Sequence, residues 1–230
     1  MATSTPKKSK SPKSQKTPSR KEVISQSTSP KSSPNRNLSD VAKRLRDCCA
    51  TWHEHVNKWS KLNELGTSLA NKLVNLQLQK EYNAVEESTT LSLANDQDLA
   101  FKLQGDIPKA SQELSRIYSS LADLHTKMEA LVQNFHAIRK LQSIQRNNDN
   151  GSDNRIFNTW TIERFCDASQ RLLDSFTKEL SLKERLVTEF TYCKNRDQLM
   201  VYLSLWLHEP LLNDDNDVLL ESMLIETELR

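Results

Sequence analysis

Residue types that can do chemistry come together at one place in the sequence, where two cysteines and two histidines lie close to one another. Cys48, Cys49, His53 and His55 all carry side chains that bind zinc. Cys49 and His53 are four apart and would share one face of a helix, whereas His55 would lie on the face that carries Cys48. A tetrahedral site needs ligands that converge on one point. The spacing therefore favours packing of these side chains, and we expect no metal site.

Acid–base chemistry needs polar groups that converge in a cleft, and the other ionisable residues give no such pattern. Carboxylates follow helical faces with basic residues nearby, as Glu179 does with Lys183 four positions later, which is typical of a solvated pair. His208 falls at an expected helix end, where a positive charge is favourable, and Cys166 falls on an apolar face. We expect no catalytic residue, no cofactor and no enzymatic activity.

The element that must position these residues is a long apolar seam in the first half of the chain. Apolar residues recur at alternating intervals of three and four from Leu38 to Leu76, and only His55 and Gly66 interrupt them. This spacing is the heptad pattern of a coiled coil, and as one helix it would be ~60 Å long. Such a seam must pack on another helix, either in this chain, in a second copy or in a different protein.

Two further segments have helical spacing. Apolar residues over 110–138 repeat the three-four pattern, and Asp106 and Pro108 suit the first turn of that helix. Residues 84–97 are polar with little periodicity and predict a flexible connection, so the first two helices are expected to form an antiparallel hairpin. The segment 162–190 has a wider apolar face, which is typical of packing in a bundle.

The end of the chain is predicted to form short helices. The run 199–207 is apolar nearly all round and is predicted to be the most buried segment, ending before Pro210. A polar turn is expected over 213–217, and the apolar residues after it predict a last helix that docks rather than frays. Helix caps are expected at Asn37 or Ser39, at Thr159 or Thr161, and at Asn195 or Asp197.

These patterns predict an all-α protein: an elongated coiled-coil or helical bundle of three long helices, with short C-terminal helices and a disordered basic N-terminal tail. Residues 1–36 are expected to be the tail and 37–230 the helical domain. No stretch approaches 18 consecutive apolar residues, so no membrane span is expected. The expected helices cover about 38–82, 106–145, 160–194, 196–208 and 217–229.

The tail differs from the rest of the chain in charge and composition. Residues 1–36 carry a net charge of +8, which leaves −6 for the remainder, and they contain ten serines, five prolines and no aromatic residue. Such a segment buries too little apolar surface to fold. Five of its residues precede a proline, as in substrates of cyclin-dependent kinases, and phosphorylation would offset the positive charge. These candidate phosphorylation sites are Thr5, Ser11, Thr17, Ser29 and Ser33.

Five blocks of sequence go beyond periodicity, and together they resemble the cyclin-dependent kinase 2-interacting protein family over roughly residues 38–230. They are ATWHEHVNKWSKLNELG at 50–66, FNTW at 157–160, LLDSFTKELSLKE at 172–184, YLSLWLHEPLL at 202–212 and LLESMLIETE at 219–228. The resemblance implies a nuclear, non-enzymatic adaptor for cyclin-dependent kinases, cyclins, replication proteins and checkpoint proteins. It also implies a subunit of an AAA+ ATPase complex, paired with another helical subunit, in ribosome large-subunit maturation and replisome protein turnover.

The leading hypothesis is therefore a helical adaptor that docks protein partners. The alternative is a kinase-regulated, chromatin- or RNA-associated protein that acts through its basic tail, whose nucleic-acid contacts would be weak because no aromatic side chain can stack on bases. The candidate partner contacts could equally be core residues, since large apolar side chains serve both purposes. They are Trp52, Trp59, Leu62, Leu69, Leu73, Trp160 and Trp206.

Overall fold

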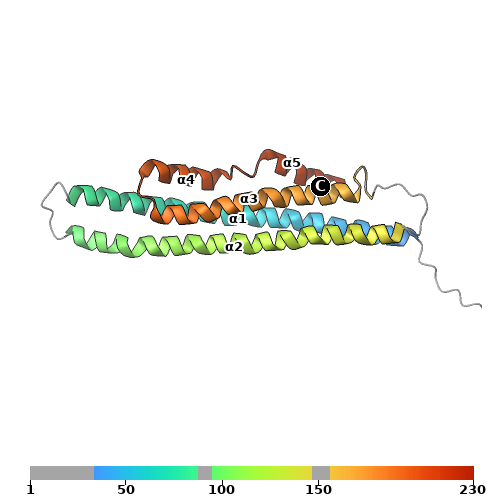
Figure 1. Cartoon of the computed structure of the whole chain (residues 1–230), viewed down its shortest axis with the longest axis horizontal. Coiled ribbons are helices and arrows are strands. Elements are labelled where there is room, and N and C mark those ends of the chain that lie inside the picture. Colours follow the sequence, from blue (N-terminus) through green and yellow to red (C-terminus); the bar gives the residue numbers. More distant parts are fainter. Residues whose placement is uncertain (1–33, 88–94, 147–155) are drawn as a thin grey trace, which may run out of the picture. The chain divides into compact units, whose positions relative to one another are not determined.

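A computed structural model describes residues 34–87, 95–146 and 156–230 of the chain, and over these ranges it contains helices and no strand. The all-α prediction is thus confirmed for the described residues. Residues 1–33 of the predicted tail, with its five candidate phosphorylation sites, lie outside these ranges, as does the middle of the predicted flexible connection, whereas residues 34–36 belong to the first helix. The helices are α1 (Pro34–Glu87), α2 (Asn95–Arg146), α3 (Ile162–Tyr192), α4 (Arg196–His208) and α5 (Asp214–Glu226) (Figure 1).

The three longest helices pack side by side with alternating direction. α1 contacts α2 along its length, α2 contacts α3, and successive helices run in opposite directions (Figure 1). The neighbours that the first apolar seam needs are therefore helices of the same chain, chiefly α2. Within this core Trp59 and Phe176 meet edge to face with their ring centroids 4.9 Å apart, a favoured geometry for aromatic pairs.

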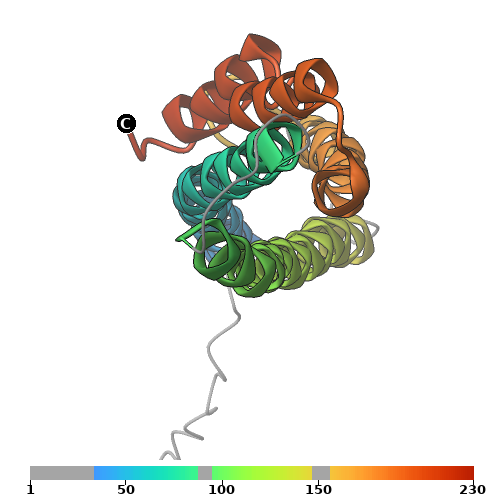
Figure 2. The ribbon, with the colours of Figure 1, turned by 90° about the vertical axis from the view of Figure 1, so that its left-hand side faces the viewer.

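The two C-terminal helices complete the bundle. α4 and α5 each contact both α1 and α3, and they follow one another along these two helices (Figure 1). Seen from the end, α1, α2, α3 and the pair α4–α5 surround the core (Figure 2). The pair therefore occupies the position of a fourth helix that is divided into two short segments.

Two predicted helix starts were wrong. α2 begins at Asn95, so Asp106 and Pro108 lie inside it rather than in its first turn. A proline inside a helix removes one hydrogen bond at a cost of ~3 kcal/mol, which the burial of neighbouring Ile107 and Ala110 helps to offset. α1 begins at Pro34, before both of its predicted caps, Asn37 and Ser39.

The caps of α3 and α4 follow the prediction. Thr161 is the N-cap of α3, and Asn195 caps α4 by accepting a hydrogen bond from the backbone N–H of Gln198 over 3.0 Å. The polar turn predicted over 213–217 was wrong, because α5 already begins at Asp214. The three aspartates of this segment lie in the first turn of α5, where negative charge stabilises a helix.

No helix in the described part of the chain has an apolar stretch long enough to cross a membrane.

Candidate partner-docking surface

Exposed apolar side chains gather on the two C-terminal helices. Among the large hydrophobic residues that are exposed in the described ranges, six lie between residues 200 and 225, and Val218 is 65% exposed. Burying one such side chain completely is worth ~1.5–3 kcal/mol, so a group of them left in water is a potential binding surface. We call this group the outer face; it consists of Met200, Val201, Leu207, Leu211, Val218 and Ile225.

The prediction that residues 199–207 form the most buried segment was wrong. Only Leu199 and Trp206 of α4 are buried, whereas Met200 and Leu207 are each 50% exposed. Helical residues seven positions apart share one face, and each of these two pairs is seven apart. One face of α4 packs on α1 and α3, and the adjoining line that carries Met200 and Leu207 is only half covered by the described residues.

Trp206 anchors α4 to α1. Its ring is fully buried, and its indole N–H donates a hydrogen bond to the backbone carbonyl of Asn63 over 3.4 Å. Gly66 leaves the space for this ring, because a Cβ at that position would lie 2.5 Å from Cζ2 of Trp206, well inside the optimal carbon–carbon separation of ~3.5–4.0 Å. The glycine that interrupts the apolar seam is thus the residue that lets α4 pack.

A buried ion cluster lies beneath the joint between α4 and α5. Lys183 and Glu179 of α3 have no exposed side-chain area, and Lys183 Nζ lies 3.5 Å from Glu179 Oε1 and 3.2 Å from Glu209 Oε1. The ammonium group also donates to Oδ1 of Asn63 over 2.6 Å and lies 4.5 Å from the centroid of the Trp206 ring. The prediction of a solvated Glu179–Lys183 pair was wrong, because both residues lie on the inward face of α3.

Glu209 connects this cluster to the turn after α4. Its backbone is left-handed, with φ of 44°, and its carboxylate accepts a hydrogen bond from the indole N–H of Trp59 over 2.7 Å. The backbone N–H of Leu211 donates to Oε2 of Glu179 over 3.1 Å. Burial raises the pKa of Glu179, and the positive charge of Lys183 opposes that shift. Removing one member would leave a buried charge unpaired, so the cluster holds the turn after α4 against α3.

The end of α5 is fastened by a second buried carboxylate. Glu226 accepts hydrogen bonds from the backbone N–H groups of Thr159 and Trp160, the latter over 2.8 Å. Burial alone would raise the pKa of Glu226, but these hydrogen bonds outweigh it and the net shift is downward. Arg46 of α1 also donates to the backbone carbonyl of Glu228 over 2.9 Å. The α4–α5 segment is therefore held at its joint, by the ion cluster, and at the end of α5, by Trp160 and by Arg46 of α1.

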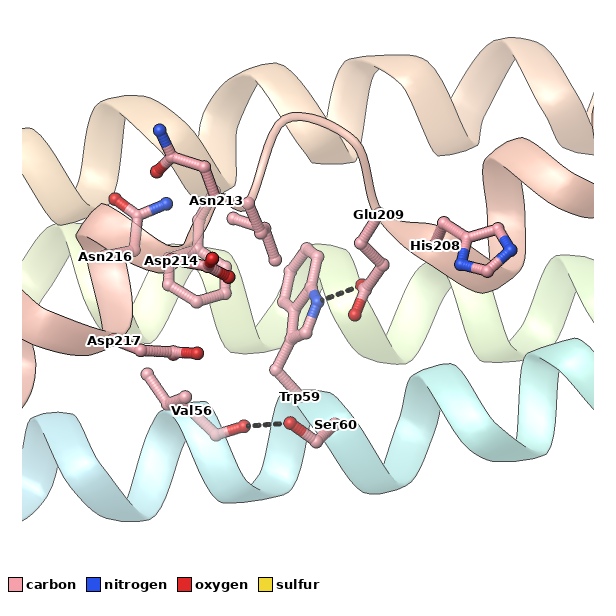
Figure 3. Close-up of a pocket in the computed structure, with 11 residues that line it drawn as sticks. Val56, Trp59, Ser60, His208, Glu209, Asn213, Asp214, Asn216 and Asp217 are labelled. Atoms are coloured by element: carbon pink, nitrogen blue, oxygen red, sulfur yellow. Dashed lines mark hydrogen bonds between the residues drawn. The ribbon is translucent and has the colours of Figure 1, made fainter.

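A pocket of about 190 Å³ lies at the joint between α4 and α5. Trp59 and Phe176 form part of its apolar lining, and Glu209, Asp214 and Asp217 add carboxylates (Figure 3). Figure 3 shows that its walls come from α1, from the end of α4 and from the first turn of α5. The volume is below the ~300–1,000 Å³ of most small-molecule sites, and it suits a single side chain of a partner.

The structure places the sequence-predicted contact residues in or against the core. Trp52, Trp59, Leu73, Trp160 and Trp206 are buried, and Leu62 and Leu69 are partly buried. Side chains without exposed area stabilise the chain's own fold, which argues against direct partner contact by the five buried residues. Their docking role stays a prediction, whereas the exposed apolar surface is formed by other residues.

The cysteines and histidines of the first helix do not form a cluster of ligands. Among the described residues, no group of three or more His, Cys, Asp or Glu side chains could hold a metal ion. Cys49 is buried and Cys48 is partly buried, and burial raises the pKa of Cys48 to about 11. Burial also lowers the pKa of His55. These side chains contribute to packing on α1.

Comparison with known proteins gives a consistent set of relatives, although no family model matches the chain. The human cyclin-dependent kinase 2-interacting protein is 31% identical over 193 residues, which cover 83% of this chain and 91% of that protein. The mouse protein of the same name is similar to the same extent, and the Xenopus laevis protein is 30% identical over 190 residues, or 90% of its length. The chain belongs to the cyclin-dependent kinase 2-interacting protein family.

Proposed function

We propose that the protein is a non-enzymatic helical adaptor whose outer face docks partner proteins. The observation that carries this proposal is the group of exposed apolar side chains on α4 and α5, two helices that are held in place by their buried residues. Removing clustered apolar surface from water drives protein association. The relatives indicate a first partner, since their name describes a protein that interacts with cyclin-dependent kinase 2.

The resemblance of the five sequence blocks extends this proposal to larger assemblies. It supports a nuclear subunit of an AAA+ ATPase complex that acts in ribosome large-subunit maturation and replisome protein turnover. It also supports links to cyclins, replication proteins and checkpoint proteins. In this proposal the three long helices pack as a coiled-coil scaffold, and the scaffold presents α4 and α5 to the partner.

A second candidate function is favoured by the net charge of +8 on residues 1–36. A basic tail would bind chromatin or RNA weakly, and phosphorylation of its five Ser-Pro and Thr-Pro sites would weaken that contact further. Deleting residues 1–33 separates the two candidates. Loss of a salt-sensitive association with nucleic acid, with kinase binding intact, supports the tail function; an unchanged salt titration rejects it.

The adaptor function is tested by co-purification of the full chain with cyclin-dependent kinase 2. The double variant Met200→Ser/Leu207→Ser should retain less than a tenth of the kinase, which corresponds to a loss of at least ~1.4 kcal/mol in binding free energy. Leu65→Ser is the matched control, because Leu65 lies on α1 and is 56% exposed. Equal recovery of the kinase by the double variant and by wild type would contradict docking on the outer face.

A further inference from the structure

We propose that the outer face receives an amphipathic helix of a partner protein, and that this helix places a lysine or arginine in the pocket between α4 and α5. The inference rests on the proposed adaptor function and names the chemistry of the partner. Three features of the described residues support it: the spacing of the exposed apolar side chains, the lining of the pocket, and the charge around both.

The spacing of the exposed side chains suits a helix. Met200 and Leu207 are seven positions apart on α4, and Val218 and Ile225 are seven apart on α5; all four are at least half exposed. Residues at this interval lie in line along a helix. The two lines lie on helices that follow one another along α1 and α3 (Figure 1). A partner helix with apolar residues at the same seven-residue interval could contact both lines.

The pocket supplies a place for one basic side chain. Its lining combines the apolar surfaces of Val56, Trp59 and Phe176 with the carboxylates of Asp214 and Asp217 (Figure 3). Lysine and arginine have a long aliphatic stem and a charged head, and they pack the stem on apolar surface while the head stays with polar groups. A basic head would gain a charge contact with these carboxylates, an apolar side chain would gain none, and an acidic one would be repelled.

The charge around the outer face has the same sign as the pocket. Residues 196–230 contain eight aspartates or glutamates and two arginines, a net charge of −6. Asp197, Asp214, Asp215 and Asp217 are exposed, so they are available to a partner. Complementary charge favours correct encounter and rejects partners of like charge. The partner helix should therefore carry basic residues beside its apolar stripe.

This charge also argues against a second copy of the chain as the occupant. In a symmetric dimer the same surface of each copy meets the other, so two outer faces would bring two acidic regions together. Like charges across an interface are unfavourable. The occupant is therefore a different, basic helix.

The proposal is tested by selecting helical peptides against the full chain. α4 and α5 have 13 residues each and are therefore ~20 Å long, so a displayed library of 28-residue amphipathic helices, ~42 Å long, covers both. The library is randomised at one central position and along the flanks of the apolar stripe. We expect the selected helices to carry lysine or arginine at the centre and a net positive charge on the flanks.

Variants of both molecules locate the contact. Binding of a selected helix should fall at least tenfold with Met200→Ser/Leu207→Ser and with Asp214→Asn/Asp217→Asn, and should be unchanged with Leu65→Ser. Replacing the central lysine of the helix by norleucine, which keeps the stem and removes the charge, should also weaken binding at least tenfold. The affinity should fall as salt rises, because exposed charges are screened.

Three results would overturn the inference. The first is selection of neutral or acidic helices, and the second is failure to select any helix. The third is a dimer in sedimentation that Leu207→Ser dissociates, because a second copy of the chain would then be the occupant. The adaptor function is judged separately. If Met200→Ser/Leu207→Ser no longer recovers the kinase but the selected helices show no preference for positive charge, the adaptor function stands and the basic helix is rejected. Unchanged kinase recovery would reject docking on the outer face itself.

Discussion

The three long helices and the two C-terminal helices use their apolar residues differently. α3 buries residues along one face from Ile162 to Phe190 and carries one exposed large hydrophobic residue, Tyr192 at its end. α4 has 13 residues, of which Leu199 and Trp206 are buried, while three large hydrophobic residues are exposed. Both regions are helical and rich in leucine, so the difference lies in how many neighbours each helix has.

This difference separates folding from docking. A helix in the middle of a bundle meets neighbours on most of its apolar side, whereas a peripheral helix meets them on one face only. The exposed parts of the apolar residues on α4 and α5 have no contact with the rest of the described chain. They are therefore available for a partner, while the buried residues of the same helices keep that face in position.

The strongest test of this separation compares two neighbouring residues of α4. Trp206→Ala should lower the free energy of unfolding by ~3–5 kcal/mol, because it removes a fully buried ring. Leu207→Ala should change it by no more than ~0.5 kcal/mol, since that side chain is half exposed. Equilibrium unfolding in denaturant measures both. Similar losses for the two variants would mean that α4 has no distinct inner and outer face.

The buried ion cluster should give the next largest effect. Lys183→Met keeps the length of the side chain but leaves Glu179 and Glu209 without their cation, and should cost about 3 kcal/mol. Adding Glu179→Leu should recover part of this loss, because replacing both members of a buried pair by apolar residues is close to neutral. A double-mutant cycle by denaturant unfolding gives the coupling. Strictly additive losses would show that the pair does not act as a unit.

The carboxylate that fastens α5 predicts a dependence on pH. The pKa of Glu226 is lower in the folded chain than its usual value, so its stabilising contribution is present above the unfolded value of about 4.3 and is lost as the pH falls through the folded pKa. Glu226→Gln should cost ~1–2 kcal/mol at pH 7 and much less at pH 3. Denaturant unfolding at the two pH values measures this change, and an equal cost at both would contradict it.

Substitution of the glycine at the close approach of α4 to α1 should change stability least, and a second glycine of the chain serves as its control. Gly66→Ala places a Cβ against the Trp206 ring, and we expect a net loss of about 1 kcal/mol, since the strain exceeds the gain in helix propensity. Gly105→Ala, in an open position on α2 with nothing within 4 Å of the new Cβ, should instead stabilise the chain by ~0.5–1 kcal/mol. Thermal unfolding compares the two. A gain in stability at both positions would contradict the conclusion that Gly66 is needed for α4 to pack on α1.

The long helices could be predicted from sequence because heptad spacing reports directly on a face that packs along another helix. The partner of the first seam could not be predicted, because seams that pair within a chain and between chains have the same pattern. The start of α2 could not be predicted, because a proline is typical of the first turn of a helix, whereas Pro108 lies inside α2. The WLHEP block lies at the joint between α4 and α5, and the FNTW block holds the end of α5 through Glu226; their composition alone does not reveal these contacts.

The buried Lys183–Glu179 pair shows a signal that was available. Residues 172, 176, 179, 183, 186 and 190 alternate at intervals of four and three, so the two charged residues occupy positions of the buried face. The pair was predicted to be solvated because spacing of four is also that of surface ion pairs. For α4 the signal was the excess of apolar residues, since a short helix that is apolar all round needs more neighbours than a chain end provides.

Docking on the C-terminal helices is tested most directly by hydrogen exchange of the full chain with and without bound cyclin-dependent kinase 2. Binding should slow amide exchange across residues 199–226, which contain the outer face, and should leave the exchange near Leu141 on α2 unchanged. Leu141 is an exposed apolar residue of α2, and α2 contacts neither α4 nor α5. Protection near Leu141 with none across 199–226 would contradict the claim that the C-terminal helices are the docking surface.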